Sequence, residues 1–204
     1  MDSNDLIQFI KGRRSYRKFL DKEIPENELG QLIDTIKHCP TNSNNQDTRL
    51  TIIKDRQKLK EVSDVCVNFF KIKAEVASKA FPRTEEDQRL IDYGAKLLEL
   101  QKTDIDPIFY NASAVIIFHT DKDCCQRNDN CVIASTTMSI IARSMGIEST
   151  YMGLFEYASQ SSKEIWDVIN LPETDQIYSA IILGYPSYEY PNDIERKPLN
   201  VTWF

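Results

Sequence analysis

Hydrophobic residues recur along this chain at two spacings, one typical of helices and one typical of strands. Apolar positions three or four residues apart predict helices at about residues 3–11, 25–38, 56–70, 85–98, 130–145 and 163–171. Shorter apolar or β-branched runs predict strands at residues 49–53, 114–119, 148–151 and 177–183. This alternation predicts one α/β or α+β domain over residues 1–204, because no change of composition marks a boundary.

The ends of the predicted helices carry their own signals. Ser3 and Asp55 are expected to cap the first and third helices, and residues 84–87 and 161–164 resemble capping boxes. Gly146 is expected to close the helix over residues 130–145 in the left-handed conformation. The apolar positions of that helix are Val132, Ile133, Thr137, Ile140 and Ile141. Gly153 is predicted to lie in a turn.

Two stretches stand out from this pattern. The run at residues 114–119 is continuously apolar, so this strand is predicted to be buried on both faces. Residues 66–108 show helical spacing on both sides of Pro82, and we predict a helical excursion over the core there. Its aromatic residues, which would either line a lid or belong to the core, are Phe69, Phe70, Phe81, Tyr93, Phe109 and Tyr110.

Composition narrows the classes of function. The 204 residues are 41% hydrophobic and 27% charged with a net charge of −6, whereas dedicated nucleic-acid binders are more often basic. No apolar run reaches the length of a membrane span, and the first residues lack the pattern of a signal peptide. The five cysteines are irregularly spaced, which argues against a disulfide framework or a metal site and favours the cytoplasm.

A basic stretch at residues 13–19 is the first candidate for chemistry. Its sequence is Arg-Arg-Ser-Tyr-Arg-Lys-Phe, and guanidinium groups together with a serine hydroxyl suit a dianionic phosphate. Taken alone, such a cluster is more often a solvated basic turn. In an acidic chain it favours a small anionic ligand over a polyanion. A second stretch, Pro40-Thr41-Asn42-Ser43-Asn44-Asn45-Gln46, is a polar loop rich in side-chain amides.

Other familiar signatures are absent from the sequence. Neither a Rossmann fingerprint nor a Walker loop occurs, and no nucleophile stands with a base in a recognisable arrangement. The only histidines are His38 and His119, and both are expected to be structural. No catalytic acid or base is therefore assigned.

Several of these stretches, in order, resemble the nitroreductase family of flavin-dependent oxidoreductases. The matching blocks are residues 13–19, 40–46, 130–146, 151–155, 184–186 and 196–198, so only about residues 66–108 lack a match. The resemblance implies a nitroreductase-like fold, with a central, mostly antiparallel sheet surrounded by helices. It also implies a domain-swapped homodimer that holds FMN at the subunit interface.

The resemblance further implies which residues hold the cofactor. Those for its phosphate and ribityl chain are Arg13, Arg14, Ser15, Arg17, Arg196 and Lys197. Those that would reach the ring or ribityl chain from the other subunit, or order that loop, are Pro40, Thr41, Asn42, Asn44 and Gln46. Met152, Gly153 and Leu154 would lie against the ring, with a backbone N–H directed at flavin N5.

The activity implied by the resemblance is hydride transfer from NAD(P)H to a nitroaromatic, quinone or similar electron-poor acceptor by a ping-pong mechanism. One alternative is a flavoprotein of the same fold that is reduced by a separate ferredoxin-like partner or performs a specialised reaction. Another is a non-enzymatic module that binds phosphate or nucleic acid, against which the acidic composition and the remaining blocks weigh. Neither nucleic acid nor a membrane is expected as a partner.

Overall fold

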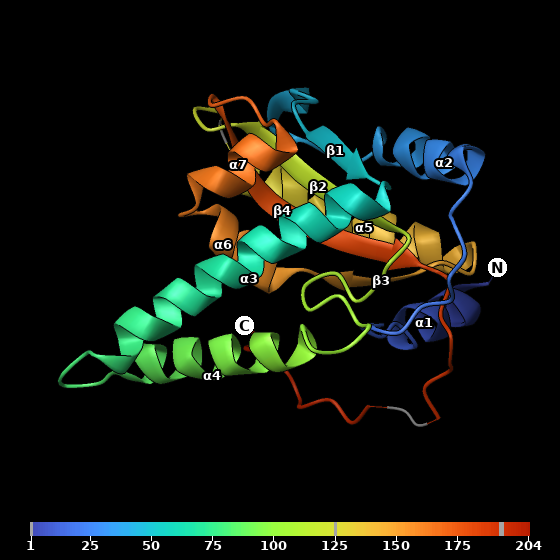
Figure 1. The fold of residues 1–204 in the computed structure, drawn as a ribbon. Helices are drawn as coiled ribbons and strands as arrows, with labels where there is room; N and C mark the ends of the chain where they lie inside the picture. Colours follow the sequence, from blue (N-terminus) through green and yellow to red (C-terminus); the bar gives the residue numbers. More distant parts are fainter. Residues whose placement is uncertain (1, 125, 192–193) are drawn as a thin grey trace.

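The computed structural model describes residues 2–124, 126–191 and 194–204. Its centre is a four-stranded sheet in which every described pair of neighbours is antiparallel. The strands, in spatial order, are β1 (Arg49–Ile53), β2 (Ala114–Asp121), β4 (Asp175–Gly184) and β3 (Glu148–Tyr151). Helices cover both faces of this sheet (Figure 1). The α+β arrangement with an antiparallel sheet surrounded by helices is therefore confirmed.

Alternating side chains of β2 build two cores. Val115 and Ile117 point to one face of the sheet, and Ala114, Ile116 and Phe118 point to the other. The helices on the first face are α3 (Arg56–Ser78), α6 (Gly153–Ser159) and α7 (Lys163–Ile169). Those on the second face are α2 (Glu26–Ile36) and α5 (Arg127–Ser144). The prediction that this strand is buried on both faces is confirmed, because a strand covered by helices on both sides exposes no polar face.

The first helix, α1 (Ser3–Lys11), is capped by a different residue from the predicted one. The Asp2 carboxylate accepts the N–H of Asp5 at 2.9 Å, and the Asp5 carboxylate accepts the N–H of Asp2 at 3.3 Å. A carboxylate at this position both satisfies an unpaired N–H and complements the helix dipole. The prediction of Ser3 as the cap is therefore wrong.

The remaining helix signals have mixed outcomes. Asp55 caps α3 by accepting the N–H of Lys58 at 2.7 Å, and Thr84 forms the predicted capping box at the start of α4 (Glu85–Leu100). Gly146 adopts the predicted left-handed conformation with φ of 76°. At the start of α7, among the described residues, Ser162 makes no side-chain capping bond, so the capping box predicted there is wrong.

α5 packs on the sheet with its small residues instead of its branched ones. The buried residues of α5 are Asn130, Cys131, Ala134, Ser135, Met138, Ser139 and Ala142. Small side chains let the helix come close to the sheet, where the hydroxyls of Ser139 and Ser149 lie 2.6 Å apart. The branched stripe is less buried than these residues: Val132 is 40% exposed, and the half-buried members are Ile133, Thr137, Ile140 and Ile141. Ile141 still packs against the core on this face of the sheet.

The turn predicted at Gly153 is instead the first turn of α6. Met152 is the residue before the helix, and Phe155 and Ala158 are buried three residues apart on its inner side. A seven-residue helix gives a weak periodic signal, which is why the sequence pattern did not reveal it.

α3 and α4 form a hairpin that extends beyond the sheet (Figure 1). Gly94 allows this close approach, because a Cβ at that position would lie 2.7 Å from the Cβ of Ala74 and 3.3 Å from the carbonyl oxygen of Phe70. Phe81, at the tip, is 98% exposed. Residues 66–108 thus comprise the end of α3, all of α4 and the loop that leads to β2.

The two ends of the described chain leave apolar side chains uncovered. No residue of α1 is buried, and Leu6, Ile7 and Ile10 lie on its exposed face. The tail after β4 runs below the body of the molecule in Figure 1 and carries the fully exposed Trp203 and Phe204. Within the described ranges, no helix combines the length and the apolar character needed to cross a bilayer.

Candidate functional site

The basic stretch at residues 13–19 runs along β3, the edge strand of the sheet. The N–H of Tyr16 donates to the carbonyl of Ser149 at 3.2 Å, and the hydroxyl of Thr150 donates to the carbonyl of Tyr16. β3 then leads directly into residues 152–154. These bonds therefore bring the basic stretch beside the turn that the sequence assigns to the flavin ring.

Side chains of the basic stretch alternate between two sides. Arg14 and Tyr16 are buried, with 6% and 7% of their surface exposed, whereas Arg13 and Ser15 are half-buried and Arg17 is exposed. Successive side chains of an extended segment point in opposite directions. Arg13, Ser15 and Arg17 therefore share the outer side, and Arg14 lies on the inner side.

Two tyrosines of the tail pack against this stretch. The hydroxyl of Tyr190 donates to the carbonyl of Ser15 at 3.0 Å, and the rings of Tyr16, Tyr188 and Tyr190 lie 5.0–5.6 Å apart between centroids. Burial and the hydrogen bond with Tyr190 raise the pKa of Tyr188 to about 12, so Tyr188 stays neutral at physiological pH. Farther along the tail, both Arg196 and Lys197 are exposed.

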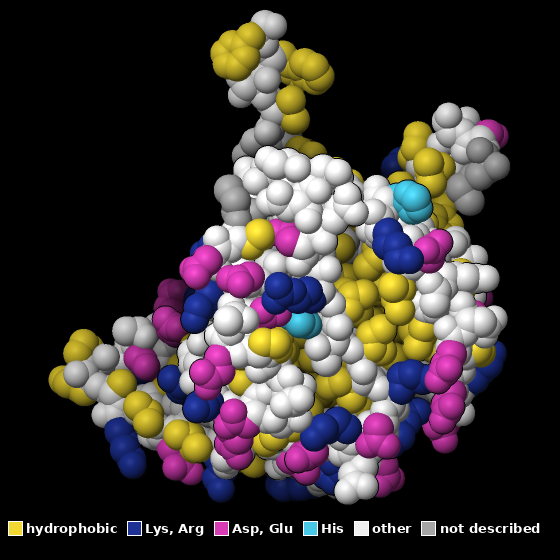
Figure 2. Space-filling view, turned by 90° about the horizontal axis from the view of Figure 1, so that it is seen from above, with side chains coloured by type: hydrophobic (Ala, Val, Ile, Leu, Met, Phe, Trp, Pro, Cys, Tyr) yellow, Lys and Arg dark blue, Asp and Glu magenta, His cyan; other side chains and the backbone are white. Residues whose placement is uncertain are grey.

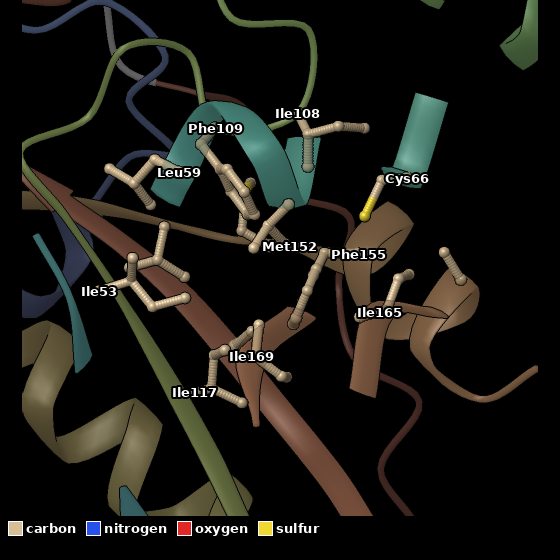
Figure 3. Close-up of a cluster of buried hydrophobic side chains, with 14 of the residues drawn as sticks. Ile53, Leu59, Cys66, Ile108, Phe109, Ile117, Met152, Phe155, Ile165 and Ile169 are labelled. Atoms are coloured by element: carbon tan, nitrogen blue, oxygen red, sulfur yellow. The ribbon is translucent and has the colours of Figure 1, made fainter. Parts of the chain in front are cut away.

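The turn after β3 is held by both polar groups of Ala180. The N–H of Met152 donates to the Ala180 carbonyl at 2.9 Å, and the N–H of Ala180 donates to the Glu156 carboxylate at 2.7 Å. Burial raises the pKa of Glu156, and the bond from Ala180 opposes this effect. The Met152 side chain lies in the core with Phe109 and Phe155 (Figure 3). The carbonyl of Met152 accepts the N–H of Glu156 at 2.9 Å, so both polar backbone groups of Met152 are bonded within the chain.

A pocket of about 950 Å³ opens at this turn, within the range of small-molecule sites. The predicted site residues that line it are Arg17, Met152, Gly153 and Leu154. The opposite wall comes from α4, and the guanidinium of Arg17 lies 5.9 Å from the ring centroid of Tyr110. Of the predicted lid aromatics, the ones that line the pocket are Phe70, Tyr93 and Tyr110. Phe109 is buried in the core.

The polar loop at residues 40–46 lies in a different part of the chain. Thr41 and Gln46 line a separate, largely apolar hollow of about 360 Å³ between α2, β1 and the start of α5. Figure 2 shows hydrophobic side chains gathered in a hollow on the face seen from above. Within the described chain, no residue of this loop lines the first pocket. One chain therefore presents two separate groups of predicted site residues.

Side chains hold this loop in an unusual conformation. Ser43, Asn44 and Gln46 all have positive φ, a region that costs free energy for residues with a Cβ. Asn130, at the start of α5, accepts the N–H of Asn42 at 3.1 Å and donates to the carboxylate of Asp47 at 2.9 Å.

Gln46 and Thr41 add bonds within the loop. The N–H of Gln46 donates to the Thr41 hydroxyl at 3.0 Å, and the Gln46 amide donates to the Asn44 side chain at 3.1 Å. The arrangement suits the predicted ordering role of Gln46. Pro40 is exposed at the loop entrance.

The residues at the first pocket have the right chemistry for FMN. Of the basic stretch, Arg17 lines the pocket and offers a charge-assisted donor for a phosphate, whereas Arg13 and Ser15 lie on the same segment outside the described lining. A Cβ added at Gly153 would meet no atom within 4 Å, so the space beside the turn is open to a flat ring. The N–H groups of Gly153 and Leu154 belong to the first turn of α6. The first N–H groups of a helix have no hydrogen-bond acceptor within the helix.

The histidines lie outside this pocket. The Nδ1 of His119 lies 2.7 Å from the Asp175 carboxylate, and its Nε2 lies 3.0 Å from the Thr51 hydroxyl. Burial lowers the pKa of His119 below its ordinary value of 6.5. Arg49 completes this network by pairing with Asp175. His119 is therefore structural, as predicted, and His38 is exposed. Among the described residues, no group of three or more His, Cys, Asp or Glu could hold a metal ion.

Three residues that hold the site were not identified from the sequence. Glu156 fixes the turn after β3, Asn130 fixes the polar loop, and Tyr190 fixes the carbonyl of Ser15. Glu156 would have been recognisable as a buried acid only if α6 had been predicted. Asn130 and Tyr190 act across 88 and 175 residues of sequence, and no local pattern records such contacts.

Two known proteins of similar sequence share one description. A putative NADH dehydrogenase/NAD(P)H nitroreductase of Archaeoglobus fulgidus is 21% identical over 190 residues, which are 91% of this chain and 87% of that protein. A second protein of the same description, from Methanothermobacter thermautotrophicus, is 22% identical over 192 residues, 90% of this chain and 78% of that protein.

Solved structures of similar shape contain FMN. A nitroreductase of Bacteroides fragilis with bound FMN has a TM-score of 0.75 and 18% identity, covering 98% of this chain and 100% of that one. An oxidized iodotyrosine deiodinase bound to FMN and 3-iodo-L-tyrosine has a TM-score of 0.72 and 19% identity, covering 97% and 98%. An FMN-dependent nitroreductase of Mycobacterium smegmatis in complex with NADPH has a TM-score of 0.65 and 20% identity, covering 91% and 90%.

At these identities the solved structures establish the fold alone. The family model described as the nitroreductase family matches residues 10–185, which is most of the chain. The matched range contains the basic stretch, the polar loop and the turn that opens α6. The chain therefore belongs to the nitroreductase family.

Proposed function

We propose that this protein is an FMN-dependent oxidoreductase that transfers hydride from NAD(P)H to a nitroaromatic, quinone or similar electron-poor small molecule by a ping-pong mechanism. The observation that carries the proposal is the pairing of Tyr16 with β3, together with the pocket that Arg17 shares with Met152, Gly153 and Leu154. A structure of similar fold with bound FMN and an FMN-dependent one in complex with NADPH support it.

Each element of the site has a proposed task. Arg13, Ser15 and Arg17 bind the phosphate and ribityl chain, and Arg14 supports them from the inner side. Arg196 and Lys197 close on the same phosphate from the tail. The backbone of Met152, Gly153 and Leu154 lies against the ring and offers an N–H to N5. When bound, FMN supplies the two-electron chemistry, and the protein supplies orientation and electrostatics.

The second group of site residues points to a domain-swapped homodimer. The loop residues proposed to reach the site of a second copy are Pro40, Thr41, Asn42, Asn44 and Gln46. Three observations support this exchange: the loop does not line the pocket of its own chain, α1 has no buried residue, and Val132 of α5 is 40% exposed. Apolar surfaces of this kind on a globular protein commonly mark interfaces.

We further propose that residues 1–204 form one domain whose α3–α4 hairpin serves as a lid. α4 forms one wall of the pocket and would exclude water from the reacting face of the ring. No side chain of the pocket is assigned as an acid or base, since orientation and a backbone donor suffice for the protein's share of hydride transfer.

The test is spectroscopic. The purified protein, reconstituted with FMN, should show a flavin spectrum that bleaches anaerobically on addition of NADH or NADPH. Adding a quinone or nitroaromatic should restore the spectrum, and initial rates with both substrates varied should give parallel double-reciprocal lines. A protein that cannot retain FMN would contradict the proposal at its first step.

A second candidate is a specialised reduction on the same flavin. The similarity in fold to an iodotyrosine deiodinase favours it, because that protein is bound to both FMN and an aromatic amino acid. Such an enzyme could take electrons from a ferredoxin-like partner in place of a nicotinamide. A flavin that bleaches with dithionite but with neither NADH nor NADPH would support this candidate over the first.

A further inference from the structure

One helix supplies most of the charged side chains of the pocket. The residues of α4 that line it are Glu86, Arg89, Leu90, Tyr93, Lys96 and Leu100. Their spacing of three to four residues puts them on one face of the helix, which we call the α4 wall. This face is opposite Gly153 and Leu154, where the flavin ring is proposed to lie.

The α4 wall is positively charged. With Arg17 assigned to the flavin, Arg89 and Lys96 remain as cations against the single carboxylate of Glu86. Glu86 already accepts a hydrogen bond from the Tyr157 hydroxyl at 3.4 Å. Arg89 lies 3.8 Å from Glu85, but both side chains are largely exposed, and such pairs hold a cation weakly. An excess of positive charge in a cleft of a protein with net charge −6 attracts anions locally.

The same wall provides aromatic surface between its two cations. Tyr93 stands one turn from both Arg89 and Lys96, and its ring lies 6.1 Å from that of Phe70 between centroids. Phe70 in turn stacks on Tyr157 at 5.9 Å. Flat aromatic ligands stack on such surfaces with useful free energy. The pocket therefore combines ring-binding surface with cations placed about one helical turn from it.

We propose that the electron acceptor of this enzyme is a planar aromatic molecule that carries a carboxylate or a similar anionic group, and that Arg89 and Lys96 recognise this group. The inference rests on the proposed function and names the substrate class of the same pocket. Residues three or four apart on a helix face lie about 5–6 Å apart, so Arg89 and Lys96 each stand within this distance of Tyr93, one on either side, and can reach an anion bonded directly to a ring that stacks there. The phosphates of a nicotinamide dinucleotide are separated from its ring by a ribose and fit this spacing less well.

The test compares two acceptors that differ in charge and little else, 4-nitrobenzoate and 4-nitrobenzamide. The variants are Arg89→Gln, Lys96→Gln and the double variant, with Lys102→Gln as a matched control outside the pocket lining. We expect the double variant to lose about tenfold in kcat/KM for 4-nitrobenzoate, as a charge-assisted contact is lost. Activity with 4-nitrobenzamide and all activities of Lys102→Gln should stay within about twofold, the scatter of neutral surface changes.

Two further measurements separate the possible failures. The rate at which NADH or NADPH bleaches the flavin without acceptor should be unchanged in the double variant. A loss confined to this donor step, or an equal loss with both acceptors, would overturn the proposal. Calorimetric titration with benzoate and benzamide needs neither turnover nor reduction, and the double variant should lose affinity for benzoate alone. Equal affinities of the wild type for the two ligands would overturn the inference even if the flavin chemistry is as proposed.

Discussion

The two groups of residues proposed to bind the flavin are held in place by different kinds of contact. Main-chain bonds tie the basic stretch to the sheet, since Tyr16 pairs with Ser149 and the N–H of Leu20 donates to the Tyr185 carbonyl at 2.8 Å. The polar loop has main-chain bonds within itself, such as that from the N–H of Asn44 to the Thr41 carbonyl at 3.0 Å, but the side chain of Asn130 ties it to α5, and three of its residues have positive φ.

This difference has consequences for mutation. A main-chain bond survives most substitutions of the residues that make it, whereas a side-chain bond is lost with a single one. We therefore expect the basic stretch to keep its position through many changes and the polar loop to move after one. The loop is also the part that we propose to reach a second copy of the chain, and in that arrangement its position determines whether the site is complete.

The largest expected effect comes from separating the two copies. Ile7→Asp combined with Ile10→Asp places charges on the exposed face of α1, where burial against a partner would be costly. We expect a monomer by light scattering, with folding retained by circular dichroism because neither residue is buried in one chain. FMN binding should be lost, since the polar loop no longer reaches a second site. A monomer that retains FMN would show that the loop is not part of the site.

The next largest effect comes from removing basic side chains while the main chain of the basic stretch keeps its position. Arg13→Ala combined with Arg17→Ala removes two charge-assisted contacts, each of about 1.5–3 kcal/mol, so FMN affinity should fall by about 100-fold or more. The main-chain pairing of Tyr16 does not involve these side chains, and the melting temperature without FMN should hardly change. Lys11→Ala, at the end of α1, is the control and should bind FMN normally. Equal affinity of the double variant would place the phosphate elsewhere.

Two single variants test whether the polar loop depends on side-chain bonds more than the basic stretch does. Asn130→Leu removes both bonds of a buried amide and should weaken FMN binding about tenfold, with a loss of about 1–3 kcal/mol in stability. Ser149→Ala removes a buried hydroxyl contact with Ser139 and costs about 1 kcal/mol, but it leaves the carbonyl that pairs with Tyr16. Its FMN affinity should stay near that of the wild type. Fluorescence titration with FMN and urea denaturation give both quantities.

The features that could be predicted from the sequence are those set by regular spacing or by neighbouring residues. Contacts that depend on main chain and on regular spacing, such as the double burial of β2 and the capping of α4 by Thr84, were predicted correctly. The basic stretch was recognised because its residue types are contiguous. The inner position of Arg14 was not foreseen, because the sequence does not say which side of an extended segment faces the protein.

Predictions were wrong where one sequence signal is compatible with two structures. Glycine is common both in turns and at helix ends, so Gly153 was assigned to a turn although it opens α6. α5 has two candidate faces, and small residues such as Ala134 and Ala142 outcompete the branched stripe for the sheet because they permit closer packing. The roles of Asn130 and Glu156 required the folded chain, since each joins segments that the sequence treats separately.

The smallest expected effect is a dependence of stability on pH that arises near the polar loop. Next to it, the exposed Arg49 and the buried His119 both pair with the buried Asp175, and the hydroxyl of Thr120 donates to the Asp47 carbonyl at 2.8 Å. The folded-state pKa of His119 lies below 6.5, so the unfolded chain binds more protons once the pH falls below that value. Stability is then lost by up to about 1.4 kcal/mol per pH unit until the folded pKa is reached.

Other titratable groups change the stability of the folded state in other ranges of pH or in the opposite direction. Burial works against the charged form of Asp175, but the bonds from Arg49 and His119 keep its pKa below 3.8, so its contribution is lost only in stronger acid. Burial raises the pKa of Asp106, Glu148 and Glu156, and these groups favour the folded state as the pH falls. The wild-type curve is therefore a sum of opposing contributions.

A comparison with His119→Gln isolates the histidine from this sum. Between pH 7.5 and pH 5.5, the free energy of unfolding should fall by more in the wild type than in the variant, because only the wild type must keep a buried imidazole neutral. Hydrogen exchange at pH 5.5 should accelerate first at Asn42 and Gln46, while the amide of Tyr16 stays protected by its main-chain bond to β3. Equal acceleration on both sides would mean that the two parts of the site are not held independently.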